Sequence, residues 1–142
     1  MNGFRLNNKV AVVTGGASGI GQAIALCFAE CGAVVRIVDL NGEAAQKTAE
    51  RISQLGGSST AHLCDFTDAV QTADVFGKIL ELSRVDILVN SAGVAHVGRL
   101  DPTSDEEFER IFRVNVLASA PKATCAEHRS VQGMSLKAVP GL

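Results

Sequence analysis

A glycine-rich segment, TGGASGIG at residues 14–21, constrains the fold of this chain more than any other feature. The apolar run KVAVV precedes it and is typical of a buried strand, whereas the segment QAIALCFAECG that follows it has helical character. Glycines at such a junction allow a tight turn and let backbone N–H groups at the start of the helix reach an anion. The segment therefore predicts a strand, a turn and a helix that hold a phosphate, although a glycine turn alone also serves as helix punctuation.

Short segments rich in β-branched residues recur along the first two thirds of the chain, at residues 9–14, 33–39, 59–64 and 86–90. Segments of helical character separate them. Near-continuous apolar runs such as VAVV and ILV suit strands that are buried on both faces of a parallel sheet. We therefore predict an α/β fold, a Rossmann-like doubly wound parallel sheet that is truncated after the fourth strand and the helix that follows it.

Charge and hydrophobicity narrow the class of protein. The 142 residues carry a formal net charge of −2 and contain no cluster of Lys and Arg, so nucleic acid is not an expected partner. No apolar run approaches the roughly 20 residues that a membrane-spanning helix needs, and the N-terminal segment lacks the apolar stretch of a secretory signal. These features predict a cytoplasmic protein without a membrane partner.

The cysteines of the chain show no CxxC spacing, which favours a reducing compartment and predicts no metal site. Cys27 and Cys31 lie four residues apart and would share a helical face with Ile24 and Phe28. Free cysteine behaves as a small apolar residue and is often buried. We therefore expect Cys27 and Cys31 to fill the core rather than to bind a ligand.

Asp39 ends the second predicted strand, downstream of the glycine-rich segment. A carboxylate at this strand end accepts hydrogen bonds from the 2′- and 3′-hydroxyls of an adenosine ribose and repels a 2′-phosphate. The glycine-rich segment also contains no basic residue that would attract an extra phosphate. The cofactor predicted here is NAD, with NADP less favoured; the alternative is that Asp39 only turns or caps the chain before NGE.

The order of these motifs resembles the short-chain dehydrogenase/reductase family, whose dinucleotide turn is T-G-x-x-x-G-x-G. Further matches are DFTD at residues 65–68, NSAG at residues 90–93 in place of N-N-A-G, and RVNV, which contains Asn115. The resemblance covers about residues 6–118. It implies an oxidoreductase that binds NAD(H) and transfers a hydride to or from a carbonyl or alcohol substrate.

The resemblance also implies which residues bind the cofactor. They are Thr14, Gly15, Ser18, Gly19, Ile20 and Gly21 in the diphosphate loop, Asp39 and Leu40 at the ribose, Asp65 and Phe66 at the adenine, and Asn90, Ala92 and Gly93 in the turn beside the ribose. Ser91 replaces the more usual second Asn and retains a hydroxyl, so an altered contact is expected there. The alternative for Asp65 is that it caps the third helix.

Asn115 is the candidate catalytic residue, and its position can also be argued from periodicity. It follows Ile111 by four residues and Phe108 by seven, so a helix would direct it with the apolar face toward the core. Burying an amide without partners costs about 1–3 kcal/mol, so a partner is expected. In the family this Asn holds a water in a proton relay; the alternative is a structural Asn that bonds a neighbouring loop.

The remaining acid–base residues of the family have no counterpart in this sequence. The family transfers the proton with the tyrosine of a Y-x-x-x-K motif, whose lysine lowers the pKa of that tyrosine, and this chain contains no tyrosine. We therefore expect the chain alone to be catalytically incompetent, acting on a substrate only when it is completed by other residues. The alternative is a non-catalytic nucleotide-binding or interaction fragment that pairs with a full-length relative.

The periodic pattern ends near residue 118. The segment beyond it contains Pro121 and Pro140 and has no period of 3.6 or 2. We predict an NAD-binding half-domain at residues 1–118 and an irregular or disordered divergent tail at residues 119–142. The hypothesis for the tail is a foreign ending that arose from a frameshift, altered splicing or a gene-model error. The alternative for its structure is a short helix docked on the sheet. The fourth strand would then have an unpaired edge, through which, together with the fourth helix, the chain could associate with itself or with a relative.

Overall fold

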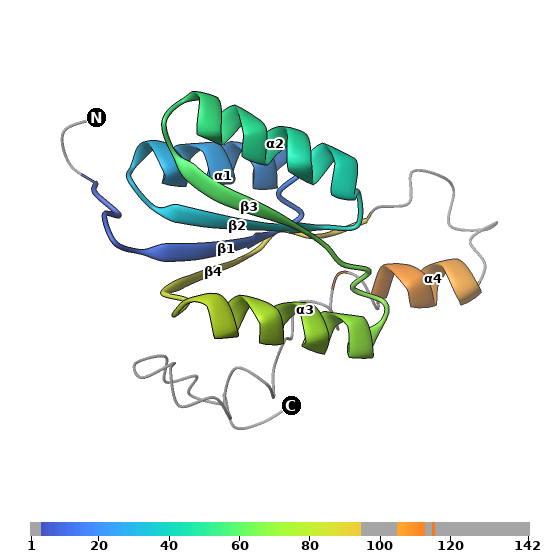
Figure 1. Cartoon of the computed structure of the whole chain (residues 1–142). Helices are drawn as coiled ribbons and strands as arrows, with labels where there is room; N and C mark the ends of the chain where they lie inside the picture. The colour runs from blue at the N-terminus through green and yellow to red at the C-terminus, as the bar shows by residue number, and fades with distance from the viewer. Residues whose placement is uncertain (1–3, 95–104, 113–114, 116–142) are drawn as a thin grey trace, which may run out of the picture.

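A parallel sheet lies at the centre of the computed structural model, which describes residues 4–94, 105–112 and 115. Its strands, in chain order, are β1 (Val10–Thr14), β2 (Val34–Asp39), β3 (Ser58–Leu63) and β4 (Ile87–Asn90). The helices are α1 (Gly19–Glu30), α2 (Gly42–Gln54), α3 (Ala69–Leu82) and α4 (Asp105–Phe112). The four strands are all parallel and are arranged in the order β3-β2-β1-β4 (Figure 1).

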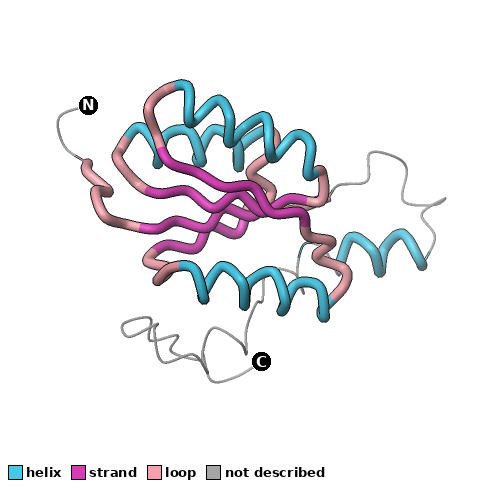
Figure 2. Tube along the Cα trace, in the orientation of Figure 1, coloured by secondary structure: helices cyan, strands magenta, loops and turns pink. Residues whose placement is uncertain are grey.

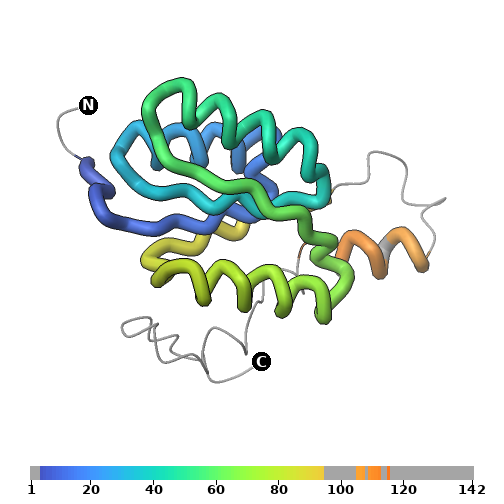
Figure 3. The backbone as a smooth tube through the Cα atoms, viewed as in Figure 1, coloured from blue at the N-terminus to red at the C-terminus, as the bar shows by residue number. Residues whose placement is uncertain are grey.

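This arrangement confirms the predicted α/β class, and every strand begins and ends within one residue of its predicted segment. The chain moves outward from β1 to β2 and β3 and then returns to place β4 on the other side of β1, as the colour gradient of Figure 3 shows. In open α/β sheets, ligands bind beyond the carboxyl ends of the strands where the direction of winding reverses. That reversal lies here between β1 and β4.

Helices cover both faces of the sheet (Figure 2). On one face, Val13 and Ile37 pack with residues of α1 and α2 such as Ala25 and Ile52. On the other face, the neighbouring strand residues pack against α3: Val12, Val38, Phe76 and Ile79 share a cluster with Cys64. Because successive strand residues point to opposite faces and both faces are covered, the strands need apolar residues at consecutive positions.

The position of Cys27 corrects a prediction. Cys27 is exposed, whereas it was expected in the core, and Cys31 is partly buried and packs against the core cluster. The buried side of α1 is formed by Gly21 and Ala25. Cys27 follows Ala25 by two residues, which is a rotation of about 200° around an α-helix and places it on the opposite side.

β4 lies at an edge of the sheet formed by the described residues, where its recorded partner is β1. The predicted tail at residues 119–142 lies outside the described residues. Within the part of the chain that the structure describes, no helix has the length and apolar character needed to cross a membrane.

Candidate nucleotide-binding site

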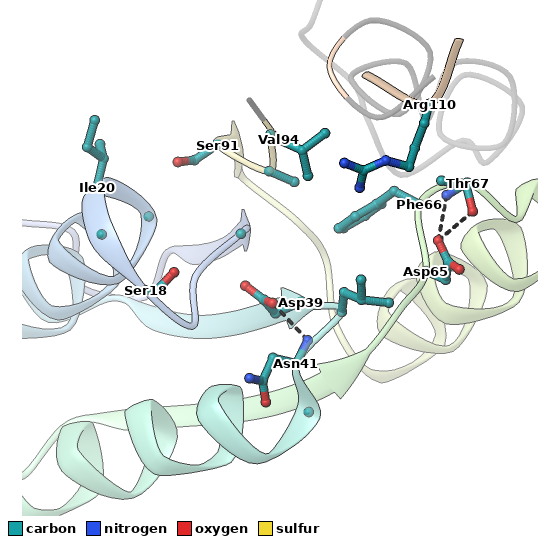
Figure 4. Close-up of a pocket in the computed structure, with 17 residues that line it drawn as sticks. Ser18, Ile20, Asp39, Asn41, Asp65, Phe66, Thr67, Ser91, Val94 and Arg110 are labelled. Carbon is teal, nitrogen blue, oxygen red and sulfur yellow. Dashed lines mark hydrogen bonds between the residues drawn. The ribbon is translucent and has the colours of Figure 1, made fainter. Parts of the chain in front are cut away.

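A cavity of about 950 Å³ opens at the carboxyl ends of the strands. Its walls come from the segments that follow β1, β2, β3 and β4, with one contribution from α4 (Figure 4). The volume falls within the range of about 300–1,000 Å³ that is usual for small-molecule and cofactor sites. Eleven of the thirteen predicted cofactor residues line it, namely Gly15, Ser18, Gly19, Ile20, Gly21, Asp39, Leu40, Asp65, Phe66, Ala92 and Gly93.

The turn between β1 and α1 requires glycine at several positions. Gly15 and Gly19 have φ angles of +67° and +54°, in the left-handed region that favours glycine. A Cβ atom at Gly15 would lie 2.7 Å from the Cα of Ala92, and one at Gly21 would collide with the carbonyl oxygen of Gly15. The glycines therefore let the turn pass close to the β4 loop and let α1 begin directly behind the turn.

The N-terminus of α1 leaves its first N–H groups without a side-chain cap. Ser18 occupies the N-cap position but makes no side-chain cap hydrogen bond. By contrast, the N-cap residues Asn41 and Asp68 accept hydrogen bonds from the first turns of α2 and α3. Since the first N–H groups of a helix have no partner within the helix and lie at its positive end, this end of α1 is suited to bind phosphate.

Asp39 both braces the turn and borders the cavity. Its Oδ2 accepts a hydrogen bond of 3.0 Å from the backbone N–H of Ala17, and its Oδ1 accepts one of 2.9 Å from that of Asn41 (Figure 4). Each carboxylate oxygen has two acceptor positions, so both can accept a further hydrogen bond. The alternative of a turn-bracing role is therefore seen in the structure, and it leaves the carboxylate able to accept from a ligand as well.

Asp65 lies across the cavity, beside Phe66 (Figure 4). Its Oδ1 accepts hydrogen bonds from the hydroxyl of Thr67 at 2.7 Å and from the backbone N–H of Thr67 at 2.9 Å. Both hydrogen bonds lower the pKa of Asp65, and the one from the hydroxyl has the larger effect. Asp65 is therefore an ionised hydrogen-bond acceptor. Asp68 caps α3, so the alternative that Asp65 serves as that cap is wrong.

Thr14 stands behind the cavity rather than in its lining. Its buried hydroxyl donates to the carbonyl oxygen of Val89 at 3.3 Å and accepts from the backbone N–H groups of Ser91 and Ala92 at 3.1 and 3.2 Å. Thr14 thus fixes the turn after β4. Asn90 is also absent from the lining, whereas Ser91 forms part of it.

Asn115 is exposed, so the prediction of a buried amide is wrong. The expectation of a partner is confirmed, because its Oδ1 accepts from the N–H of Val94 at 2.8 Å and its Nδ2 donates to the carbonyl oxygen of Val94 at 2.7 Å. Asn115 has π-helical backbone, and the wider turn of a π-helix moves residues off a 3.6-residue stripe. The observed contact is that of a structural Asn bonding a neighbouring loop.

The prediction omitted Arg110, which α4 contributes to the lining. Figure 4 shows its guanidinium directed toward Phe66, with Val94 nearby. Arg110 places a positive charge in a cavity that also contains Asp39 and Asp65. In the sequence it is one of several charges in the segment DEEFERIF, which resembles a solvated helix face, so no local signal distinguishes it. Asn41, Gly42 and Thr67 also line the cavity without having been predicted.

The chain belongs to the short-chain dehydrogenase family, whose model matches residues 9–125. D-threitol dehydrogenase from Mycolicibacterium smegmatis is 44% identical over 117 residues, an alignment that covers 80% of this chain and 44% of that relative. The family match extends past residue 118, and the division of the chain at that residue remains a prediction.

Two solved structures illustrate the structural similarity. A putative NAD(P)-dependent gluconate 5-dehydrogenase from Beutenbergia cavernae, with NADP bound at low occupancy, has a TM-score of 0.77 and 34% identity, covering 82% of this chain and 46% of its own. A 7α-hydroxysteroid dehydrogenase complexed with NADH and 7-oxo glycochenodeoxycholic acid has a TM-score of 0.74 and 38% identity, covering 80% of this chain and 45% of its own. This chain therefore spans less than half the length of these relatives.

Proposed function

We propose that the cavity binds the adenosine diphosphate half of a nicotinamide dinucleotide, and that the chain belongs to an oxidoreductase acting on a carbonyl or alcohol substrate. The observation that carries this proposal is the uncapped N-terminus of α1 behind its glycine turn, open to a cavity that also contains two aspartates. The nicotinamide ring, when bound, supplies hydride transfer. Residues of this chain bind and orient the cofactor.

The N–H groups at the start of α1 hold the diphosphate, in the first turn formed by Gly19, Ile20 and Gly21. Asp39 accepts hydrogen bonds from the adenosine ribose, and Asp65 accepts one from the adenine amino group. Ala92 and Gly93 lack large side chains and let the ribose approach the carboxyl end of β4. Thr14 acts as a positioning residue, since its hydrogen bonds fix that turn.

NAD is the cofactor we propose, because a 2′-phosphate at the ribose would meet the carboxylate of Asp39. The similar solved structures include one with NADP and one with NADH, so the preference proposed for this chain depends on Asp39. Like charges a few ångströms apart repel, and the low dielectric of a cavity strengthens the effect.

Proton transfer is proposed to depend on residues outside this sequence. The chain contains no tyrosine, and Asn115, whose amide is hydrogen-bonded to Val94, is not an ionisable acid. Hydride transfer to a carbonyl needs an acid that protonates the developing alkoxide. We expect this chain to bind the cofactor without turning over a substrate by itself.

Titration of the chain with NADH, followed by the fluorescence of the reduced nicotinamide, tests the binding. Saturable binding by a sample whose circular dichroism shows the α/β fold is the expected result. A folded sample that leaves the fluorescence unchanged and shows no heat of binding with ADP-ribose would overturn the proposal. In parallel, NAD with a panel of alcohols should give no NADH absorbance, and turnover by the pure chain would contradict the proposed need for further residues.

A second candidate function is that of an interaction fragment that binds a full-length relative. Two observations favour it: β4 has β1 as its recorded partner in the described sheet, and the Phe112 side chain is 47% exposed on α4. An edge strand presents unpaired N–H and C=O groups to another chain. Sedimentation velocity of the chain mixed with a full-length relative should then show a complex that Phe112→Ser weakens; two species that sediment independently at all concentrations would contradict this candidate.

A further inference from the structure

The C-terminal end of α1 carries two cysteines that no part of the proposed cofactor site uses. The backbone N–H of Cys31 donates a hydrogen bond of 3.0 Å to the carbonyl oxygen of Cys27, so one α-helical turn separates them. Residues at this spacing have Cβ atoms about 5–6 Å apart on the same side of the helix. Cys27 is exposed and Cys31 partly buried, and both are free thiols.

Both thiols border one cavity of about 390 Å³. Its other walls come from the segment before β1, which contributes Phe4, Arg5 and Asn7, and from Glu30 and Gly32 at the end of α1. Gly32 has a φ angle of +93°, so the chain turns sharply after Cys31. Cys31 also packs against the core cluster on its inner side. The two cysteines therefore share one pocket with both apolar and charged walls.

The two thiols interact with each other. After desolvation, the proximity of Cys31 and a hydrogen bond to it are the main causes that raise the pKa of Cys27, and Glu30 adds a smaller effect. A raised pKa keeps a thiol protonated at neutral pH. Cys27 is therefore a neutral thiol rather than an activated thiolate.

The spacing disfavours a direct disulfide. A disulfide needs Cβ atoms about 3.5–4.5 Å apart, whereas one helical turn separates them by about 5–6 Å. A bridging atom relaxes this requirement, because two bonds of about 2.3 Å, the length of a zinc–thiolate bond, span a larger gap than one S–S bond. The helical turn therefore accommodates a bridged pair of sulfurs better than a bonded pair.

The atom that bridges the two sulfurs must need no protein ligand besides them. Structural zinc requires four ligands, and within the described residues no group of three or more His, Cys, Asp or Glu side chains is arranged to hold a metal. A monosubstituted trivalent arsenical needs two thiols, and it is a soft centre that prefers sulfur.

We propose that Cys27 and Cys31 form a dithiol site that captures monosubstituted trivalent arsenicals. In the capture of phenylarsine oxide, the two S–H bonds and the arsenic–oxygen bond break and two As–S bonds form. The oxygen leaves as one water that carries both protons, and arsenic remains trivalent. Arg5, Phe4 and Glu30 line the pocket that receives the organic group.

This site is independent of the nucleotide site. α1 has 12 residues, so its two ends are about 18 Å apart at 1.5 Å per residue. Cofactor is proposed at the N-terminus of α1, and arsenical at its C-terminus. The two should therefore bind together.

Native mass spectrometry of the chain with phenylarsine oxide tests the proposal. The expected product is a 1:1 adduct with the mass of one phenylarsenic group less two hydrogens, stable to excess mercaptoethanol and removed by 2,3-dimercaptopropanol. Cys27→Ser and Cys31→Ser should each weaken binding by about 100-fold or more, the gain expected from linking two ligands. The double variant Cys64→Ser/Cys125→Ser should retain the adduct.

Cys27→Ser replaces an exposed side chain, so it should keep the fold, and circular dichroism checks this. Because Cys64 is buried, circular dichroism also checks the fold of Cys64→Ser/Cys125→Ser. An adduct that persists in folded Cys27→Ser, or that is lost in folded Cys64→Ser/Cys125→Ser, would overturn the assignment. So would an adduct that mercaptoethanol removes, since that shows attachment through a single thiol.

Discussion

Gly21 and Gly77 are both helical glycines, and the same substitution should affect them in opposite ways. A Cβ atom at Gly21 would collide with the backbone carbonyl of Gly15, whereas one at Gly77 would meet no atom within 4 Å. Gly21→Ala should lower the free energy of unfolding by about 1–3 kcal/mol, the usual cost of overpacking. Gly77→Ala should raise it by about 0.5–1 kcal/mol, since alanine loses less conformational freedom in a helix.

Urea denaturation followed by circular dichroism measures both changes. NADH titration adds a second readout, because Gly21→Ala displaces the turn that is proposed to hold the diphosphate, whereas Gly77 lies in α3. Equal stabilities of the two variants would show that the contact between Gly21 and Gly15 does not constrain the turn.

Asp39 and Asp65 border the same cavity, but their proposed roles differ. Asp39→Asn removes the negative charge that a 2′-phosphate would meet, so the affinity for NADPH should rise by about tenfold relative to that for NADH, a difference of about 1.4 kcal/mol. Asp65→Asn is the matched control and should change both affinities by the same factor. Competition titrations of the two nucleotides give the ratio, and an unchanged ratio in Asp39→Asn would remove the basis for preferring NAD.

At the scale of elements, Asp86 joins the start of β4 to β1. Its Oδ2 accepts a hydrogen bond of 3.0 Å from the N–H of Val10, and its own N–H donates to the carbonyl oxygen of Val10 at 2.9 Å. Its Oδ1 lies 3.5 Å from the Nζ of Lys9 and 3.3 Å from the Nε of Arg84. Asp86→Asn should lower the free energy of unfolding by about 1.5–3 kcal/mol, the range for hydrogen bonds of charged groups.

Asp74→Asn is the matched control, since Asp74 pairs with Lys78 on the exposed side of α3, and exposed pairs contribute little to stability. The hydrogen bond from Val10, followed by the charges of Lys9 and Arg84, lowers the pKa of Asp86. Its stabilising contribution is therefore complete above the usual Asp pKa of about 3.9 and is lost as pH falls through the lowered pKa. The difference between wild type and Asp86→Asn should shrink in urea titrations below that range; a constant difference would contradict the ionic contribution.

The elements themselves could be predicted from the sequence because β1 to β4 and the helices between them are regular. Apolar runs in buried parallel strands and a 3.6-residue period in the helices are local signals. The glycine turn and Asp39 were also predictable from their positions at strand ends, and Asp65 was predicted from the resemblance to the family. These residues line the cavity.

Other features depend on contacts between distant segments and gave no local signal. Arg110 reaches the cavity because α4 lies beside the segment after β3, and no periodicity within α4 indicates this. Thr14 was predicted in the phosphate loop, but its hydroxyl forms hydrogen bonds with residues about 75 positions later in the chain, beginning with Val89. Asn115 departs from the predicted helical stripe because its backbone is π-helical.

At the scale of the whole molecule, the described sheet corresponds to less than half of its relatives. It contains the winding reversal between β1 and β4 at which α/β sheets bind ligands. The two halves of the cofactor are thus proposed to depend on different residues. The adenosine half binds to residues of this chain, whereas reaction at the nicotinamide half requires residues that this sequence does not contain.

The most direct test of this account is isothermal titration of the chain with ADP-ribose, which carries the diphosphate and adenosine ribose but no nicotinamide. The account predicts 1:1 binding by wild type, at least about tenfold weaker binding by Gly21→Ala, which corresponds to about 1.4 kcal/mol, and unchanged binding by Gly77→Ala. Circular dichroism of the same samples establishes that each is folded. Folded wild-type chain that releases or absorbs no heat with ADP-ribose, and that does not protect α1 from hydrogen exchange in its presence, would contradict the central claim.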